Sequence, residues 1–280
     1  MGYDFSRGAL ATSEHPFTDD ISRDDIRVTT HYYPTRFSSS MYSVIHECGH
    51  ALFGQNTPAE DYRYYINNEK TLGMHESVSR FYENRIGHSR AFVHLIMGRA
   101  KEIMPQVFRG VTEKDFYEAV NVVEPSLIRV EADELTYTLH IIIRYEIEKE
   151  IVRKRVRIED IPRLWAEKYR QYLGVRVKND RDGALQDVHW SSGFGYFPTY
   201  ALSNLYNAMY YNRMKEDINI DSMVKQGKIS VINDWMKEHV FKKADYMDAR
   251  EWVTDITGRS FTPDDFLDYL EEKYGELYGL

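Results

Sequence analysis

Two histidines and a glutamate occur together at residues 46–50, where the sequence reads His46, Glu47, Cys48, Gly49, His50. On an α-helix, positions i and i+4 lie one above the other on the same face, so both histidines would point the same way and could hold one metal ion. Glu47 would then lie beside the ion and could act as a general base toward a water molecule. The pattern predicts a hydrolytic metal site; a chance match on a buried helix is the competing interpretation.

A metal site of this kind needs a third protein ligand. One zinc architecture adds a third histidine and a glycine at fixed positions after the second histidine, but here these positions hold Asn56 and Phe53, which excludes it. A site with two histidines and a glutamate instead takes its carboxylate from a second helix further along the chain. Glu76 and Glu83 both lie in such a segment, and the residues alone leave both candidates open.

The elements that must position these residues are mostly helices. We expect a strand at 25–33, where β-branched and aromatic residues dominate, and the metal-binding helix at 41–55. Residues 1–24 show little periodicity and are expected to form loops and turns. The spacing of apolar residues predicts further helices over 74–86, 91–104, 112–123, 127–150, 161–173, 201–216, 223–226, 229–240 and 263–278.

No internal repeat or linker interrupts this pattern, so we expect a single domain over residues 1–280. Within the predicted helix 127–150, His140 is interpreted as a packed core histidine rather than a metal ligand. Residues 186–200 form an irregular segment with two glycines, a histidine and two tyrosines, and loops of this type often line functional sites.

Composition excludes several other classes of protein. The net charge of −8 argues against a general nucleic-acid-binding protein, which would carry a basic surplus. The sequence contains no apolar run of the roughly 18 residues that a membrane span requires. Cys48 is the single cysteine, so an intrachain disulfide is impossible and a reducing, cytoplasmic compartment is expected.

With these residues laid out, the sequence resembles the carboxypeptidase Taq family of zinc metallocarboxypeptidases. The resemblance covers essentially the whole chain and rests on family motifs that occur in order: HPF at 15–17, DxRxT at 25–29, HExxH at 46–50, HES at 75–77, IRxxAD at 128–133 and GxxQDxHW at 183–190. It implies a mainly α-helical, zincin-like catalytic core, similar to neurolysin and angiotensin-converting enzyme, with a small β-sheet beside the metal helix. Homodimers are also implied.

One departure concerns length. Family members have a long helical region before the HPF motif, which begins here at His15. The chain therefore resembles the C-terminal catalytic portion of the family, and we expect the N-terminal helical region to be missing.

The resemblance also assigns roles to residues. The family's HES glutamate binds the metal, which selects Glu76 over Glu83 and implies Zn²⁺, with Co²⁺ as an alternative ion. A carboxypeptidase must hold the terminal carboxylate of its substrate, and arginine suits this task because its fork pairs with both oxygens. The implied set is His46, His50 and Glu76 for the metal, Glu47 as general base, His189, Tyr196 and Tyr200 for the oxyanion, and Arg129 or Arg27 for the substrate carboxylate.

The expected activity is therefore removal of residues from peptides with a free C-terminus. Two alternatives stay open at this point. The chain could be a zinc endopeptidase, because the zinc motif does not decide where a peptide is cut. It could also be a catalytically impaired, metal-binding fragment that binds peptides or a partner chain without cleaving them.

Overall fold

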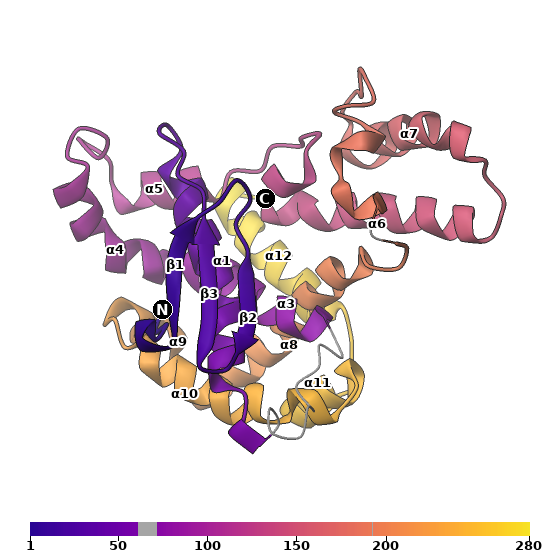
Figure 1. Cartoon of the computed structure of the whole chain (residues 1–280). Helices are drawn as coiled ribbons and strands as arrows, with labels where there is room; N and C mark the ends of the chain where they lie inside the picture. The colour runs from indigo at the N-terminus through magenta and orange to yellow at the C-terminus, as the bar shows by residue number, and fades with distance from the viewer. Residues whose placement is uncertain (61–71, 192) are drawn as a thin grey trace. The chain divides into compact units, whose positions relative to one another are not determined.

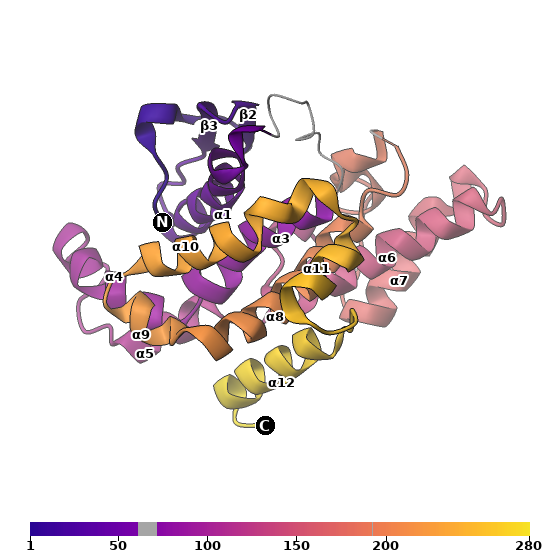
Figure 2. The same cartoon turned by 90° about the horizontal axis from the view of Figure 1, so that it is seen from below.

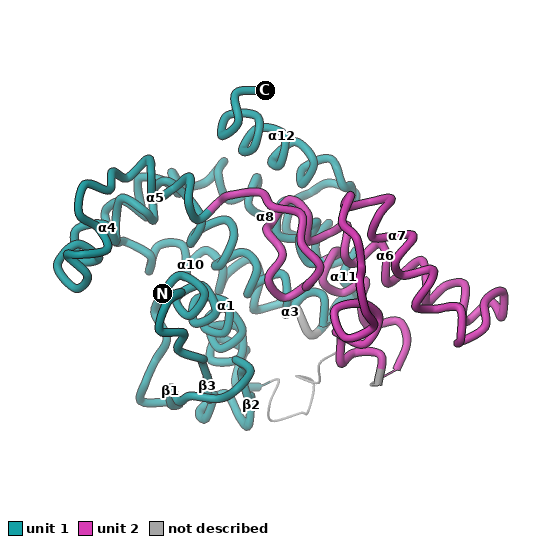
Figure 3. Tube along the Cα trace, turned by 90° about the horizontal axis from the view of Figure 1, so that it is seen from above, with its two compact units in different colours: residues 1–120, 203–280 teal, residues 121–202 magenta. Residues whose placement is uncertain are grey.

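The computed structural model describes residues 1–60, 72–191 and 193–280, which fall into two compact units. The first unit consists of residues 1–120 and 203–280, and the second consists of residues 121–202 (Figure 3). Helices dominate the described chain beside one small sheet, which confirms the expected mainly α-helical fold. Each unit is described by itself below, and the expectation of a single domain over 1–280 stays a prediction.

The sheet of the first unit has three strands (Figure 1). Strand β3 (Asp25–Thr30) is central, with β1 (Gly8–Thr12) parallel to it and β2 (Thr18–Ser22) antiparallel to it. The expected strand is confirmed, although it ends at Thr30 instead of residue 33. The expectation of loops over residues 1–24 was wrong. The side chains of β1 and β2 are mostly exposed and show no apolar alternation, so hydrogen bonding to β3 is what makes these segments strands.

Helix α1 (Phe37–Asn56) packs against this sheet. Alternate side chains of β3 point to one face, and Ile26 and Val28 bury themselves against Ala51 of the helix. The helix is longer than the expected 41–55 but contains that whole range. With β3 and α3 both packed on it, α1 is buried over most of residues 45–55, the range that contains the two histidines.

The next helices continue the first unit. Helix α3 (Leu72–Arg80) packs on α1 and runs directly into a π-helical segment, Phe81–Gly87. Helices α4 (Arg90–Ile103) and α5 (Glu113–Val120) enclose an apolar cluster that includes Phe108.

The C-terminal helices complete the first unit (Figure 2). Trp252 packs on Tyr206 and Tyr210, and the guanidinium of Arg85 from the π-helical segment lies 3.5 Å from the ring centre of Tyr269. The expectation of three helices in the last sixty residues missed the helix that carries Trp252. The elements are α8 (Pro198–Asp217), which begins in the second unit, α9 (Ile220–Lys225), α10 (Ile229–His239), α11 (Ala249–Thr257) and α12 (Asp264–Tyr278).

The second unit is built on two packed helices, α6 (Glu134–Val152) and α7 (Ile161–Leu173). The expected helix 127–150 begins later than predicted, since Asp133 accepts a hydrogen bond from the backbone N–H of Thr136 and so caps α6. Residues 129–131 form a separate short 3₁₀ helix instead. The apolar periodicity continued across this break and concealed it.

His140 of α6 is fully buried, as expected of a packed core histidine, and one ring nitrogen lies 3.0 Å from the hydroxyl of Tyr169. Burial, together with Arg144 and Arg129, lowers the pKa of His140 to about 3.

This lowered pKa predicts a pH-dependent stability. The unfolded chain binds a proton at His140 below about pH 6.5, whereas the folded chain does not until about pH 3. The contribution to stability is therefore present above about pH 6.5 and is lost as the pH falls toward 3. The free energy of unfolding of the wild type should fall between about pH 7 and about pH 5. We expect this fall to be smaller in His140→Gln by roughly 2 kcal/mol. Urea unfolding at both pH values measures it, with exposed His94→Gln as the control; equal pH slopes for wild type and His140→Gln would contradict it.

Candidate metal centre

The two histidines of α1 lie on one face of the helix, with ring centres 5.0 Å apart. Gly49 lies between them, where α1 crosses α3. A Cβ atom at Gly49 would come within 2.5 Å of the Cα atom of Ser79, a distance that Cβ atoms essentially never show. Glycine at this position therefore allows the backbone of α3 to approach the face that presents the histidines.

This close crossing predicts a large effect for Gly49→Ala. The atoms that a methyl group would meet belong to the backbone of α3, so the two helices must separate, and overpacking of this kind costs about 1–3 kcal/mol. We expect a lower melting temperature and weaker Zn²⁺ binding. Gly98→Ala in α4 is the matched control, because its Cβ would meet nothing within 4 Å. Equal melting temperatures for wild type and Gly49→Ala would show that the helices tolerate the methyl group.

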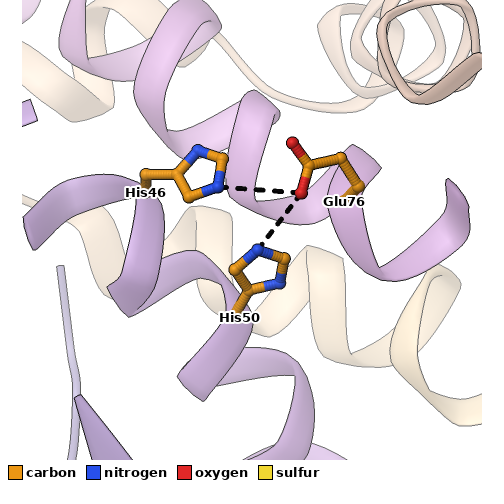
Figure 4. A group of neighbouring side chains, drawn as sticks. All are labelled: His46, His50 and Glu76. Atoms are coloured by element: carbon orange, nitrogen blue, oxygen red, sulfur yellow. Dashed lines mark ion pairs between the residues drawn. The ribbon is translucent and has the colours of Figure 1, made fainter. Parts of the chain in front are cut away.

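Glu76 of α3 faces both histidines (Figure 4). Its Oε2 atom lies 3.2 Å from Nε2 of His50 and 3.7 Å from Nε2 of His46. One donor atom from each of the three residues lies within 4.8 Å of the other two. Of the two glutamates that the residues alone left open, Glu76 is therefore the one with an oxygen close to Nε2 of both histidines.

The three donor atoms fit a single divalent ion. Ligands that bind Zn²⁺ tetrahedrally at about 2.0–2.2 Å are separated from one another by roughly 3.3–3.6 Å, and the two separations of Glu76 Oε2 from the histidine nitrogens span this range. Two imidazoles and one carboxylate form the donor set of many catalytic zinc sites, which keep the fourth position for water.

The opposite nitrogen of each histidine also has a partner. Nδ1 of His46 lies 2.7 Å from Oε2 of Glu83, and Nδ1 of His50 lies 2.6 Å from Nδ1 of His75. A carboxylate only accepts hydrogen bonds, so His46 donates from Nδ1, which leaves Nε2 as the nitrogen that can bind a metal once it carries no proton. Partners of this type set the tautomer and the ring orientation of metal-binding histidines.

The charges around the cluster shift its protonation. Burial alone would lower the pKa of His46, but Glu76 and Glu83 outweigh this and raise the pKa to about 9. Burial and the neighbouring His50 lower the pKa of His75 to about 3, so His75 is neutral, and its Nδ1 accepts from His50 when His50 uses Nε2 for a metal. Although burial opposes it, His46, His50 and Arg80 hold the pKa of Glu76 well below its usual range. A metal ion that binds here displaces a proton, which makes its affinity pH-dependent.

Glu47 is buried, follows His46 on α1, and faces β2 of the sheet with one carboxylate oxygen. Its Oε2 atom accepts a hydrogen bond of 2.7 Å from the hydroxyl of Thr18 in β2, and the same hydroxyl contacts the backbone carbonyl of Glu47 at 3.0 Å. Thr18 of the small sheet thus holds Oε2 of Glu47, and Oε1 takes no part in this hydrogen bond.

Four of the other predicted residues come together in the second unit. Nδ1 of His189 lies 2.6 Å from Oδ1 of Asp187, and Nε2 of His189 lies 3.1 Å from the hydroxyl of Tyr200. The ring of Tyr196 stacks on His189, and the guanidinium of Arg129 lies over the ring of Tyr200. Because Asp187 only accepts, the neutral ring of His189 carries its proton on Nδ1, and Nε2 accepts from Tyr200.

Comparisons with known proteins agree with the metal site. Residues 1–274 match the model of the family described as carboxypeptidase Taq (M32) metallopeptidase. Carboxypeptidase 1 from Bacillus subtilis (strain 168) is 42% identical over 280 residues, which cover 99% of this chain and 56% of that protein. Thermostable carboxypeptidase 1 from Thermus thermophilus is also 42% identical, with 99% and 55% covered.

The chain belongs to the carboxypeptidase Taq (M32) family. The crystal structure of the M32 carboxypeptidase from Deinococcus radiodurans superposes with a TM-score of 0.96 at 37% identity, over 99% of this chain and 56% of that one. This chain therefore spans about half the length of the M32 relatives that it matches. The family is one of metallopeptidases, which implies a divalent ion, and His46, His50 and Glu76 are the described residues that could hold it. No helix in the described ranges has the length and apolar character to span a membrane.

The two arginines that we expected to bind the substrate carboxylate are both paired with acidic side chains of this chain. Arg129 is buried; its Nε atom lies 2.7 Å from Asp187, and its Nη1 donates to Tyr137. Arg27 is exposed on β3 and forms two hydrogen bonds with Asp25. A substrate carboxylate would have to compete with these partners, so both assignments stay predictions, and the contacts of Arg129 favour a role in holding Asp187 and His189.

Sequence reasoning missed the residues that surround the metal ligands. Thr18 fell in a segment expected to be loop, and Glu83 was considered only as a ligand. One available signal was the spacing of Glu76, Arg80 and Glu83, which places all three on one face of a helix in an M32 motif region.

Proposed function

We propose that this chain is a zinc-dependent metallocarboxypeptidase that hydrolyses the C-terminal peptide bond of peptides. The observation that carries the proposal is the convergence of His46, His50 and Glu76 beside Glu47 in a chain of the M32 family. The relatives named carboxypeptidase 1 support the reaction class, although this chain spans 56% of the B. subtilis protein.

The roles of the residues follow from their chemistry. A zinc ion held by His46, His50 and Glu76 would polarise the scissile carbonyl and lower the pKa of a water molecule toward about 7. The free oxygen of Glu47 accepts the proton of the attacking water and returns it to the leaving amine. Thr18 holds the other oxygen during this transfer. With a metal bound through Nε2, His46 and His50 would each keep one ring N–H, on Nδ1, where Glu83 and His75 are the respective partners.

His189, Tyr196 and Tyr200 are proposed to donate to the oxyanion that develops on the substrate. Residue type, the hydrogen bond between His189 and Tyr200, and the stacking of Tyr196 on His189 support this role. When Nε2 of His189 carries only a lone pair, it accepts the single hydroxyl proton of Tyr200, so Tyr200 can donate to the oxyanion only after this hydrogen bond breaks. Arg129, with Arg27 as second choice, is proposed to bind the terminal carboxylate of the substrate. If Tyr196→Phe or Tyr200→Phe left kcat intact, that residue would be removed from the mechanism.

One assay tests the activity directly. The chain is loaded with Zn²⁺ or Co²⁺ and incubated with a peptide that has a free C-terminal carboxylate and, separately, with its C-terminal amide. Products are followed by mass spectrometry. We expect stepwise loss of C-terminal residues from the free acid only.

The other outcomes would replace the proposal. Internal cuts in both peptides would indicate a zinc endopeptidase. No products from a chain with bound metal would indicate a catalytically impaired, metal-binding chain that binds peptides or a partner chain without cleaving them.

The resemblance to the family further suggests a homodimer, and the single cysteine, Cys48, suggests a cytoplasmic location. Light scattering coupled to size-exclusion chromatography tests the first of these proposals, and fractionation of the source cells tests the second.

A further inference from the structure

The two oxygens of Glu76 face different partners. Oε2 lies toward the histidine nitrogens, whereas Oε1 lies 3.2 Å from Nε of Arg80, one helical turn later on α3. Figure 4 shows one carboxylate oxygen between the two imidazoles and the other turned away from them. Both side chains are largely buried, with 12% of Arg80 and 8% of Glu76 exposed, so solvent screens this pair only weakly.

Arg80 also connects Glu76 to the partner of His46. Its Nη1 atom lies 3.6 Å from Oε2 of Glu83, the oxygen that accepts from His46 at 2.7 Å. Arg80 is the last residue of α3, and Glu83 lies in the first turn of the π-helical segment that follows. Segments of this type occur frequently at functional sites. One guanidinium thus contacts the carboxylate that faces the metal position and the carboxylate that orients a metal-binding histidine.

We propose that Arg80 is a positioning residue that makes Glu76 a one-oxygen ligand and holds Glu83 against His46. The inference rests on the proposed function, because it requires that the cluster binds a metal. A glutamate that bound through both oxygens would occupy two coordination positions, whereas a catalytic zinc site needs one position free for water. By holding Oε1, Arg80 leaves only Oε2 for the metal and keeps that position open.

The test compares metal binding by wild type, Arg80→Met and Arg99→Met, without any substrate. Met matches the length of the arginine stem and removes its charge. Arg99 is exposed and pairs with Glu102 on the surface of α4, so it serves as the matched control. Zn²⁺ affinity is measured by competition with a chromophoric chelator, and the coordination number is read from the visible absorption of the Co²⁺-loaded protein.

We expect Arg80→Met to bind Zn²⁺ about 10–100-fold more weakly, the usual effect of losing an outer partner of a metal ligand. The Co²⁺ absorption of this variant should become weaker than that of wild type, because five- and six-coordinate Co²⁺ absorb less than four-coordinate Co²⁺. Arg99→Met should match wild type in both measurements. Wild-type affinity together with a wild-type Co²⁺ spectrum in Arg80→Met would overturn the proposal.

Two further variants keep the test decisive. Glu83→Gln should weaken Zn²⁺ binding but leave the Co²⁺ spectrum unchanged, since Arg80 still holds Oε1 of Glu76. If Arg80→Met does not fold, Arg80→Lys takes its place in the test, because a single ammonium cannot pair with two carboxylates as a guanidinium does. Wild-type Zn²⁺ affinity in Arg80→Lys would overturn the proposal. A chain that binds metal as expected yet cleaves no peptide would refute the proposed function and leave this inference standing.

Discussion

Replacing Glu47 by Gln is expected to lower kcat by about 10²–10⁴-fold, the usual contribution of general acid–base catalysis, while the metal stays bound. Glu47 is not among the three residues whose donor atoms converge, so its loss removes no ligand. Glutamine has the same shape and still accepts from Thr18 through its carbonyl oxygen, but its amide cannot take a proton from water. The structure of the site should therefore persist without turnover.

The measurement compares kcat for a free-acid peptide with the Zn²⁺ content of the same preparations. Glu102→Gln, an exposed change on α4, is the control and should behave as wild type. Retained turnover in Glu47→Gln would refute the assignment of the general base. Loss of both turnover and zinc would instead place Glu47 among the groups that hold the metal.

Replacing Asp187 by Ala is expected to destabilise the second unit by about 3–5 kcal/mol, the usual cost of leaving a buried charge unpaired. One oxygen of Asp187, Oδ2, lies 2.7 Å from Nε of Arg129 and 2.8 Å from Nε of Arg144, and all three side chains are at most 7% exposed. Although burial opposes it, His189 and the two guanidiniums hold the pKa of Asp187 well below its usual range. Alanine would leave two buried positive charges without their common carboxylate.

Urea unfolding at neutral pH measures this effect, with Asp180→Ala as the control, since Asp180 is exposed in the same part of the chain. The sign of the pH dependence provides a second check. Because the pKa of Asp187 is lowered on folding, Asp187 adds to the free energy of unfolding above its unfolded pKa of about 3.9. This contribution is lost as the pH falls below that value. A loss below about 1 kcal/mol at neutral pH would show that the arginines find other partners or that water reaches them.

Predictions from local pattern held best where a single helix decides the geometry. The i, i+4 spacing of His46 and His50 requires only the helical repeat, and the structure places both rings on one face. The mainly α-helical fold also followed from periodicity, and the family followed from ordered motifs. Element boundaries were less predictable: the helix expected from residue 127 begins at Glu134, because the cap at Asp133 interrupts an apolar pattern that itself continues.

Residues that depend on contacts between segments were beyond sequence reasoning. Arg129 carries the same guanidinium whether it binds a substrate or a neighbour, and only the fold shows that it is buried against Asp187, 58 positions away. Strands β1 and β2 have mostly exposed side chains, so their pairing with β3 left no pattern in the sequence.

Sequence alone was enough to predict the donor types of the candidate metal centre, the spacing of His46 and His50, and the family to which the chain belongs. Residue types and spacing left Glu76 and Glu83 both open, because a carboxylate has no direction until its helix is placed against another, and only the family resemblance favoured Glu76. In the structure, α1 and α3 cross at Gly49, which brings Oε2 of Glu76 near the two Nε2 atoms and leaves Glu83 beside Nδ1 of His46. The contacts of Arg80 with the two glutamates are local i, i+4 and i, i+3 pairs that the helical repeat allows, and the tertiary structure decided that these carboxylates face the histidines of α1.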